Sequence, residues 1–163
     1  MATTQVSVEE YLKSVYKPDV EYVDGELQER NVGEIEHAKM ILAVLMWFVG
    51  HRQEWQVQIL PEVRVQVKPE RFRIPDVCVS AASSSDTRIV TTPPLVVVEV
   101  LSPEDRIANY NERIADYICM GIRGVWVIDP ATRKGWDCSS GNWIETVVFQ
   151  LPDSPIHLDL SAI

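Results

Sequence analysis

The sequence lacks the features that would mark a membrane protein or a disulfide-stabilised scaffold. No apolar run approaches the about 20 residues of a membrane span, and the most apolar stretch, residues 38–49, suits a core helix. The cysteines Cys78, Cys119 and Cys138 are odd in number and form no CxxC pair, so we expect neither a disulfide framework nor a zinc site. The N-terminal residues have no basic start and no apolar core, so we expect a cytoplasmic protein without a membrane partner.

Positive charge is also scarce. The 163 residues include 15 Lys and Arg against 24 Asp and Glu, which gives a net charge of −9. Non-specific binding to nucleic acid depends on basic surface, so this balance works against it, although an acidic body can still carry a local basic groove. The length and the absence of repeats or linkers predict a single domain over residues 1–163, with its core at about residues 11–150.

The apolar patterns predict an α/β fold with a mixed β-sheet and flanking helices. Two continuous apolar runs read as buried strands, and the helical segment between them indicates a crossover that places those strands parallel in one sheet. The predicted elements are a hairpin around Asp24-Gly25, a helix over 34–51, three strands within 54–80, a strand over 95–101, a helix over 103–120, a strand over 124–129 and a hairpin within 133–148.

One carboxylate interrupts the apolar run "PPLVVVEVLSPEDR". Glu99 lies in the middle of a strand that is expected to be buried, where an ionised group is costly unless a metal or a cation compensates it. Asp76 begins the preceding strand. If the two strands are neighbours, both carboxylates can point to one side of the sheet and share a hard cation such as Mg²⁺. The alternative is that Glu99 lies at the end of the strand and faces water or a structural arginine.

The crossover helix carries two arginines that could serve the same site. Arg106 and Arg113 are seven residues apart along one flank of the helix, so both can reach toward Glu99. Alternatively, they extend to solvent or pair with acidic residues of their own helix. The apolar stripe that is expected to pack on the sheet consists of Ile107, Tyr110, Ile114, Tyr117 and Ile118.

Four segments together resemble a known family. "GELQERNVGEIEHAKM", "RIPDVCV", "PPLVVVEVLSPEDR" and "NERIADYICMGIRGVWVIDP" look like the Uma family of putative restriction endonucleases, a branch of the PD-(D/E)XK nuclease superfamily. The resemblance extends from about residue 11 to residue 130. It implies a restriction-endonuclease-like fold, metal-dependent hydrolysis of DNA with Mg²⁺ or Mn²⁺, and a possible homodimer, since two cuts need two active sites.

The resemblance also implies roles for individual residues. Asp76 and Glu99 match the two metal-binding acids, and His37 matches a histidine at the start of the long helix. The superfamily's lysine normally lies two residues after the second acid, where this chain has Leu101. In the Uma branch the resemblance implies that this lysine lies in the following helix, where "NERIADY" places Arg113. Arg106, from the pattern above, and Glu26, in the acidic hairpin, are the expected substrate-binding residues.

The replacement of lysine by arginine leaves two interpretations open. Arginine cannot act as a base, but it can stabilise negative charge that develops on a phosphate. The chain is therefore either an endonuclease that uses metal-bound water or a catalytically inactive nuclease-fold module used for binding or regulation. Hydrolysis of another phosphorylated substrate in the same site is also compatible with these residues. His37 has a purely structural alternative as well, since it lies at the polar start of a helix.

Overall fold

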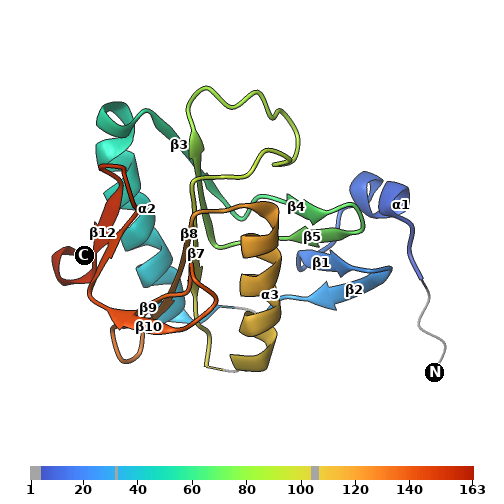
Figure 1. Ribbon diagram of the computed structural model, residues 1–163. Helices are drawn as coiled ribbons and strands as arrows, with labels where there is room; N and C mark the ends of the chain where they lie inside the picture. The colour runs from blue at the N-terminus through green and yellow to red at the C-terminus, as the bar shows by residue number, and fades with distance from the viewer. Residues whose placement is uncertain (1–4, 32, 104–106) are drawn as a thin grey trace.

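The computed structural model describes residues 5–31, 33–103 and 107–163. Its centre is a six-stranded sheet with the strand order β10-β9-β8-β7-β6-β3 (Figure 1). The strands β7 and β8 are parallel and the other neighbours are antiparallel, which confirms the predicted mixed sheet and crossover. The six strands are β3 (Val57–Pro61), β6 (Val77–Ala81), β7 (Val96–Val100), β8 (Gly124–Asp129), β9 (Lys134–Asp137) and β10 (Ile144–Thr146).

Two helices cover the opposite faces of this sheet (Figure 1). Successive strand residues point to opposite faces, so Val96 and Val98 pack in the core that includes α2 (Ile35–Trp55). Val97 packs in the second core, which includes α3 (Ile107–Met120). Among the helices of the described residues, none is long and apolar enough to cross a membrane.

A smaller four-stranded sheet lies beside the first one. Its order is β2-β1-β5-β4, and the helix α1 (Val8–Lys13) packs on it through the buried Tyr11. The hairpin predicted around Asp24-Gly25 is confirmed as the β1–β2 pair. The segment 54–80 forms four strands, not the predicted three, because β4 and β5 form a hairpin of their own in this sheet. The four strands are β1 (Val20–Val23), β2 (Glu26–Glu29), β4 (Val65–Lys68) and β5 (Arg71–Arg73).

Two further details differ from the sequence prediction. Ile107 was expected in the buried stripe of α3, but it opens the helix and is 66 % exposed, while Tyr110, Ile114 and Tyr117 are buried. The last residues, which carry no sequence signal, form β12 (His157–Asp159) and a short 3₁₀ helix (Leu160–Ala162). The strand β12 pairs with β11 (Val148–Gln150) and closes the core on the α2 side.

The chain leaves the small sheet at two places that matter for the site. After β2 it continues through Arg30 and Asn31 toward α2, and after β5 it continues through Ile74 to Asp76 and into β6. Both connections therefore bring polar residues to the end of the large sheet that faces the small one.

Candidate active site

Asp76 immediately precedes β6, and Glu99 lies in the neighbouring strand β7. In the antiparallel pairing of β6 with β7, Val77 is opposite Val98, so the next step of the register brings Asp76 and Glu99 opposite each other. Asp76 is 2 % exposed and Glu99 is 1 % exposed. The structure thus brings together the two carboxylates that the sequence analysis paired, and it buries both.

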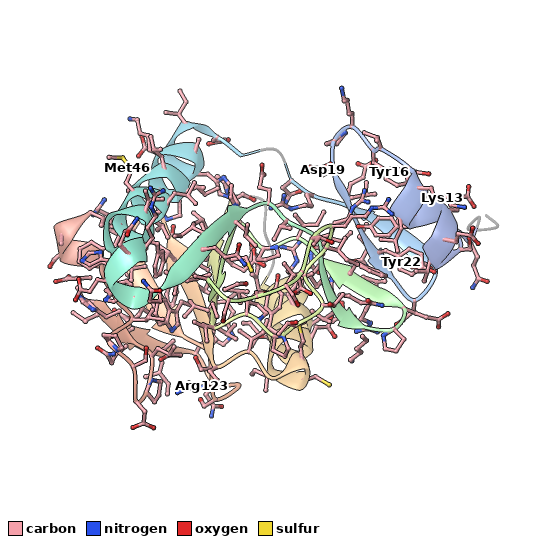
Figure 2. The ribbon with its side chains drawn as sticks, turned by 90° about the horizontal axis from the view of Figure 1, so that it is seen from above. Lys13, Tyr16, Asp19, Tyr22, Met46 and Arg123 are labelled. Atoms are coloured by element: carbon pink, nitrogen blue, oxygen red, sulfur yellow. The ribbon has the colours of Figure 1, made fainter. Side chains whose placement is uncertain are left out.

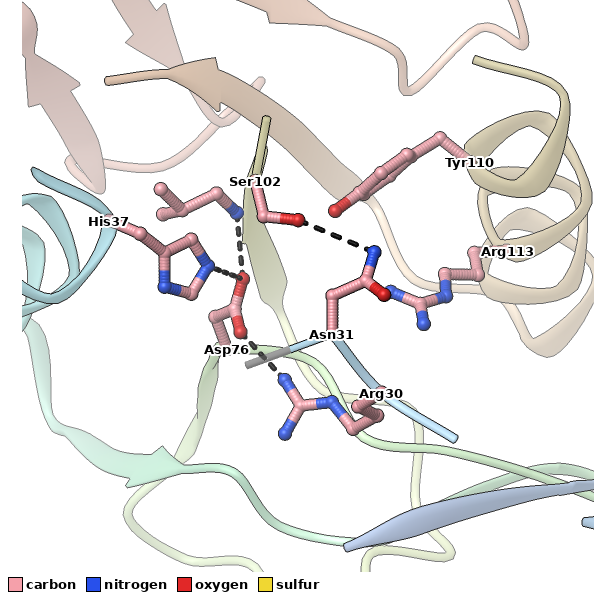
Figure 3. Close-up of a pocket in the computed structure, with 8 residues that line it drawn as sticks. Arg30, Asn31, His37, Asp76, Ser102, Tyr110 and Arg113 are labelled. Carbon is pink, nitrogen blue, oxygen red and sulfur yellow. Dashed lines mark hydrogen bonds and ion pairs between the residues drawn. The ribbon is translucent and has the colours of Figure 1, made fainter. Parts of the chain in front are cut away.

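Three positive or N–H groups surround the Asp76 carboxylate (Figure 3). Its Oδ1 accepts a hydrogen bond of 2.7 Å from Arg30 Nη2, and its Oδ2 accepts one of 2.8 Å from the backbone N–H of Val100. His37 Nε2, from the first turn of α2, lies 3.7 Å from the same Oδ2. The interaction with Asp76 raises the pKa of His37, so the imidazole is held in contact with the carboxylate in its charged form over a wider pH range.

Gly33 makes room for His37. A Cβ atom placed on Gly33 would overlap the imidazole ring of His37. The absence of a side chain at residue 33 is therefore a condition for the position that His37 takes beside Asp76.

Glu99 has one oxygen that accepts a hydrogen bond and one that has only an ion-pair partner. Its Oε1 accepts a hydrogen bond of 2.5 Å from Tyr117 Oη. Its Oε2 is buried, has no hydrogen-bond partner among the described residues, and lies 3.6 Å from Arg113 Nη1. Burial raises the pKa of Glu99 to about 8, although the charge of Arg113 opposes the shift.

Arg113 joins Glu99 to a carboxylate that the sequence analysis missed. Arg113 Nε lies 3.3 Å from Oε2 of Glu21, which is fully buried in β1. Glu21 also accepts hydrogen bonds from the backbone N–H of Ile74 (2.9 Å) and from Arg73 Nη1 (3.0 Å). Arg73 in turn donates from Nε to the buried Asp116 of α3 at 2.8 Å. A chain of buried ion pairs thus connects both sheets and α3.

A small polar pocket opens above these groups. It has an empty volume of about 270 Å³, and a larger polar cleft of about 700 Å³ shares Asn31 and Arg113 with it. Ser102 accepts a hydrogen bond from Asn31 at 3.4 Å across the pocket (Figure 3). The pocket is lined by Arg30, Asn31, His37, Asp76, Val100, Ser102, Tyr110 and Arg113.

The other predicted site residues do not join this cluster. Glu26 is exposed at the turn end of β2, whereas Gln28 and Glu29, at the other end of that strand, line the larger cleft. Arg106 lies outside the described residues.

Arg30, Tyr117 and Glu21 enter the site without having been predicted. Glu21 offered the same signal as Glu99, a carboxylate within an apolar strand, but the adjacent hairpin made its strand look half-exposed. The sequence gives no comparable signal for Arg30.

The donor set fits a hard divalent cation. Two carboxylates on adjacent strands suit Mg²⁺ or Mn²⁺, which use few protein ligands and retain several waters. Glu99 Oε2 is buried, accepts no hydrogen bond among the described residues and lies 3.6 Å from Arg113 Nη1, so it has a lone pair available for a metal cation. Within the described residues there is no group of three or more His, Cys, Asp and Glu side chains that could hold a metal, so a closed zinc-type site is not formed there.

Arg113 pairs with two buried carboxylates, so its removal is expected to destabilise the fold more than the removal of one of them. Glu99→Leu leaves Arg113 paired with Glu21, whereas Arg113→Leu leaves two buried carboxylates without their common cation. Removing one partner of a buried pair costs about 3–5 kcal/mol, so Arg113→Leu is expected to lower the free energy of unfolding by clearly more than Glu99→Leu. Urea denaturation of both variants measures this difference, and equal losses would contradict it.

The packing of Gly33 against His37 predicts an effect on the titration of that histidine. Gly33→Ala is expected to displace the imidazole from Asp76 and to return the pKa of His37 toward its ordinary value. NMR titration of the ring protons measures the shift. Gly50→Ala is the control, because a Cβ there meets no atom within 4 Å. An unchanged pKa of His37 in Gly33→Ala would show that residue 33 does not set its position.

Comparisons with known proteins identify the fold and the family. A solved structure with the same fold is described as a putative nuclease belonging to DUF820 from Anabaena variabilis ATCC 29413. It has a TM-score of 0.76 and 18 % sequence identity, over 96 % of each chain. At this level of identity the likeness establishes the fold, which is the predicted restriction-endonuclease-like one. No curated protein matches the sequence.

The family comparison covers nearly the whole chain. The family model described as Uma2, putative restriction endonuclease, matches residues 8–162, which include both sheets and every residue of the pocket. The chain therefore belongs to the Uma2 family of putative restriction endonucleases.

Proposed function

We propose that this protein is a metal-dependent endonuclease that hydrolyses phosphodiester bonds in DNA, with Mg²⁺ or Mn²⁺ held by Asp76 and Glu99. The observation that carries the proposal is the pair of opposed, buried carboxylates: Asp76 lines a pocket together with Arg30, His37 and Arg113, and Glu99 keeps a buried oxygen without a hydrogen bond. Family membership supports the reaction class, and DNA is the substrate that a restriction endonuclease would cut.

The bound metal would neutralise charge at the scissile phosphate and lower the pKa of a coordinated water. Side chains of the protein would orient the metal ligands and contact the phosphate. Arg30 and His37 hold the Asp76 carboxylate from two sides and fix its orientation. Arg113 lines both the pocket and the adjoining cleft, so its guanidinium is placed to contact a phosphate that enters from the cleft.

The arginine at position 113 is compatible with this function. Its Nε faces Glu21 and its Nη1 faces Glu99, so two nitrogens of one side chain serve two buried carboxylates. A lysine has a single nitrogen and cannot bridge them in the same way. Because arginine does not give up its proton at physiological pH, Arg113 acts as a fixed positive charge and not as a general base.

One observation favours the alternative, an inactive nuclease-fold module. Arg30 and Arg113 already provide counter-charges for Asp76 and Glu99, so both carboxylates are compensated without a metal. A module of this kind would bind its partner independently of divalent cations, and Asp76→Asn would leave that binding intact.

Cleavage assays distinguish the two. Wild-type protein with Mn²⁺ or Mg²⁺ is expected to cut at least one of supercoiled plasmid, linear duplex and single-stranded DNA. Asp76→Asn and Glu99→Gln are expected to lose activity by about 100-fold or more, since each removes a negatively charged ligand of the metal that would stabilise the transition state. Glu145→Gln, at an exposed surface ion pair on β10, is the control and should retain activity.

The proposal fails if folded wild-type protein leaves every DNA form intact with both metals. It also fails if Asp76→Asn and Glu99→Gln cut as fast as the wild type, because the cleavage would then arise elsewhere.

A further inference from the structure

The helix α2 has a second apolar face that points away from the sheet. Its inner face packs Met40, Val44, Phe48 and Trp55 into the core. Its outer face leaves large side chains in solvent: Ile35 is 72 % exposed, Leu42 58 %, Met46 67 % and Val49 44 %. Figure 2 shows Met46 at the outer side of this helix, far from α1 and the small sheet.

The outer residues follow the spacing of a coiled-coil seam. Positions 35, 39, 42, 46, 49 and 53 alternate in steps of four and three, which places them on one stripe of a helix. At 100° per residue the centre of this stripe lies opposite Val44, the centre of the buried face. Residues 40–50 contain no charged side chain, although a quarter of the whole chain is charged. A solvated helix face of a domain this acidic would be expected to carry charges.

The apolar surface widens on one side of the seam. Ala38, Ile41, Leu42 and Leu45 line a groove with an empty volume of about 870 Å³, which Pro61 borders from β3. The same groove reaches His37 and Arg30 of the active-site pocket. The outer face of α2 is therefore continuous with the edge of the site.

We propose that the outer face of α2 binds the same face of a second copy of this chain, with the two helices antiparallel. Two copies that each carry a net charge of −9 repel one another over most of their surface, and the uncharged span 40–50 is where a like-charged partner can approach. A strongly basic partner would find no charged side chain to pair with on residues 40–50.

The distribution of charge on the seam selects the antiparallel arrangement. In a parallel pair, Lys39 of one copy would lie against Lys39 of the other. With a two-fold axis near Val44, Lys39 instead faces Val49 of the partner subunit, Leu42 faces Met46 of the partner subunit, and the two lysines are separated by about 15 Å along the axis. Antiparallel helices also place opposite ends of their dipoles side by side.

The size of the helix suits such an interface. At 21 residues α2 is about 30 Å long. A standard interface buries roughly 800 Å² on each partner, which is about a tenth of the 9005 Å² surface of this chain. The exposed apolar residues of the outer face extend from Ile35 to Val49, over about 20 Å of the length of the helix. The dimer would carry two copies of the active-site pocket, each adjoining the shared helix pair.

Sedimentation equilibrium tests the interface. Wild-type protein is expected at twice the chain mass of 18.5 kDa, in low salt and in 1 M NaCl alike, because an apolar contact is not screened. Met46→Glu places two charges in the seam and is expected to raise the dimer dissociation constant by more than about 100-fold. The matched control is Ile107→Glu, since Ile107 is also helical and 66 % exposed but lies on α3. It should leave the dimer intact.

A wild-type protein that sediments as a monomer overturns the proposal, and so does a Met46→Glu variant that remains dimeric while its circular dichroism shows it to be folded. These outcomes do not depend on whether the protein cuts DNA.

Oxidative cross-linking tests the orientation. In a Cys119→Ser background, which removes the exposed native thiol, the double variant Leu42→Cys/Met46→Cys is expected to form a disulfide-linked dimer. Leu42→Cys alone is expected not to form one, because in the antiparallel pair the two residues 42 are not opposite each other. Efficient cross-linking of Leu42→Cys alone would show a parallel pair and overturn this arrangement.

Discussion

The buried carboxylate of Glu21 is the interaction on which the junction of the two sheets depends. It lies in the small sheet, yet its partners are Arg73, the backbone N–H of Ile74 and Arg113 of the helix that covers the large sheet. A fully buried charge is tolerated only with such compensation. Once Glu21 is in place, it fixes Arg113, and Arg113 in turn lies against Glu99 on the central strand.

The same network explains how both carboxylates are buried while one oxygen of Glu99 accepts no hydrogen bond and is available to a cation. Asp76 is held by Arg30, by the N–H of Val100 and by His37, whereas Glu99 is hydrogen-bonded only on the side of Tyr117. Glu99 Oε2 thus has an ion-pair partner in Arg113 but no hydrogen bond, and burial raises the pKa of that carboxyl to about 8. A divalent cation there would relieve the cost of the buried charge and would serve catalysis at the same time. The overall charge of −9 does not exclude a phosphate substrate, because the groups that face the pocket include Arg30 and Arg113.

The sequence predicted the large sheet better than the small one. The apolar runs of β7 and β8, with a helix between them, are local patterns that predict the parallel pair and place Arg113 on the helix that crosses it. The adjacency of Asp76 and Glu99 was predicted only on the condition that their strands are neighbours, which the β6–β7 pairing meets. The pairing of β1 with β5 joins segments some fifty residues apart, and no local pattern signals it. Glu21 and Arg73 were missed for that reason, since their burial exists only once those strands pair. Glu26 was chosen for its acidic hairpin, but the register places it at the exposed turn.

Calorimetric titration of Mn²⁺ into the wild type, Asp76→Asn and Glu99→Gln tests the central claim most directly, namely that the two buried carboxylates form a metal site. The account predicts one binding event per chain in the wild type, which is abolished or strongly weakened in both variants while their circular dichroism is unchanged. Binding that is equally strong in all three proteins would place the metal elsewhere. The absence of binding to the wild type, also when a DNA oligonucleotide is present to complete the coordination, would mean that Arg30 and Arg113 are the permanent partners of these carboxylates and that no metal site exists between them.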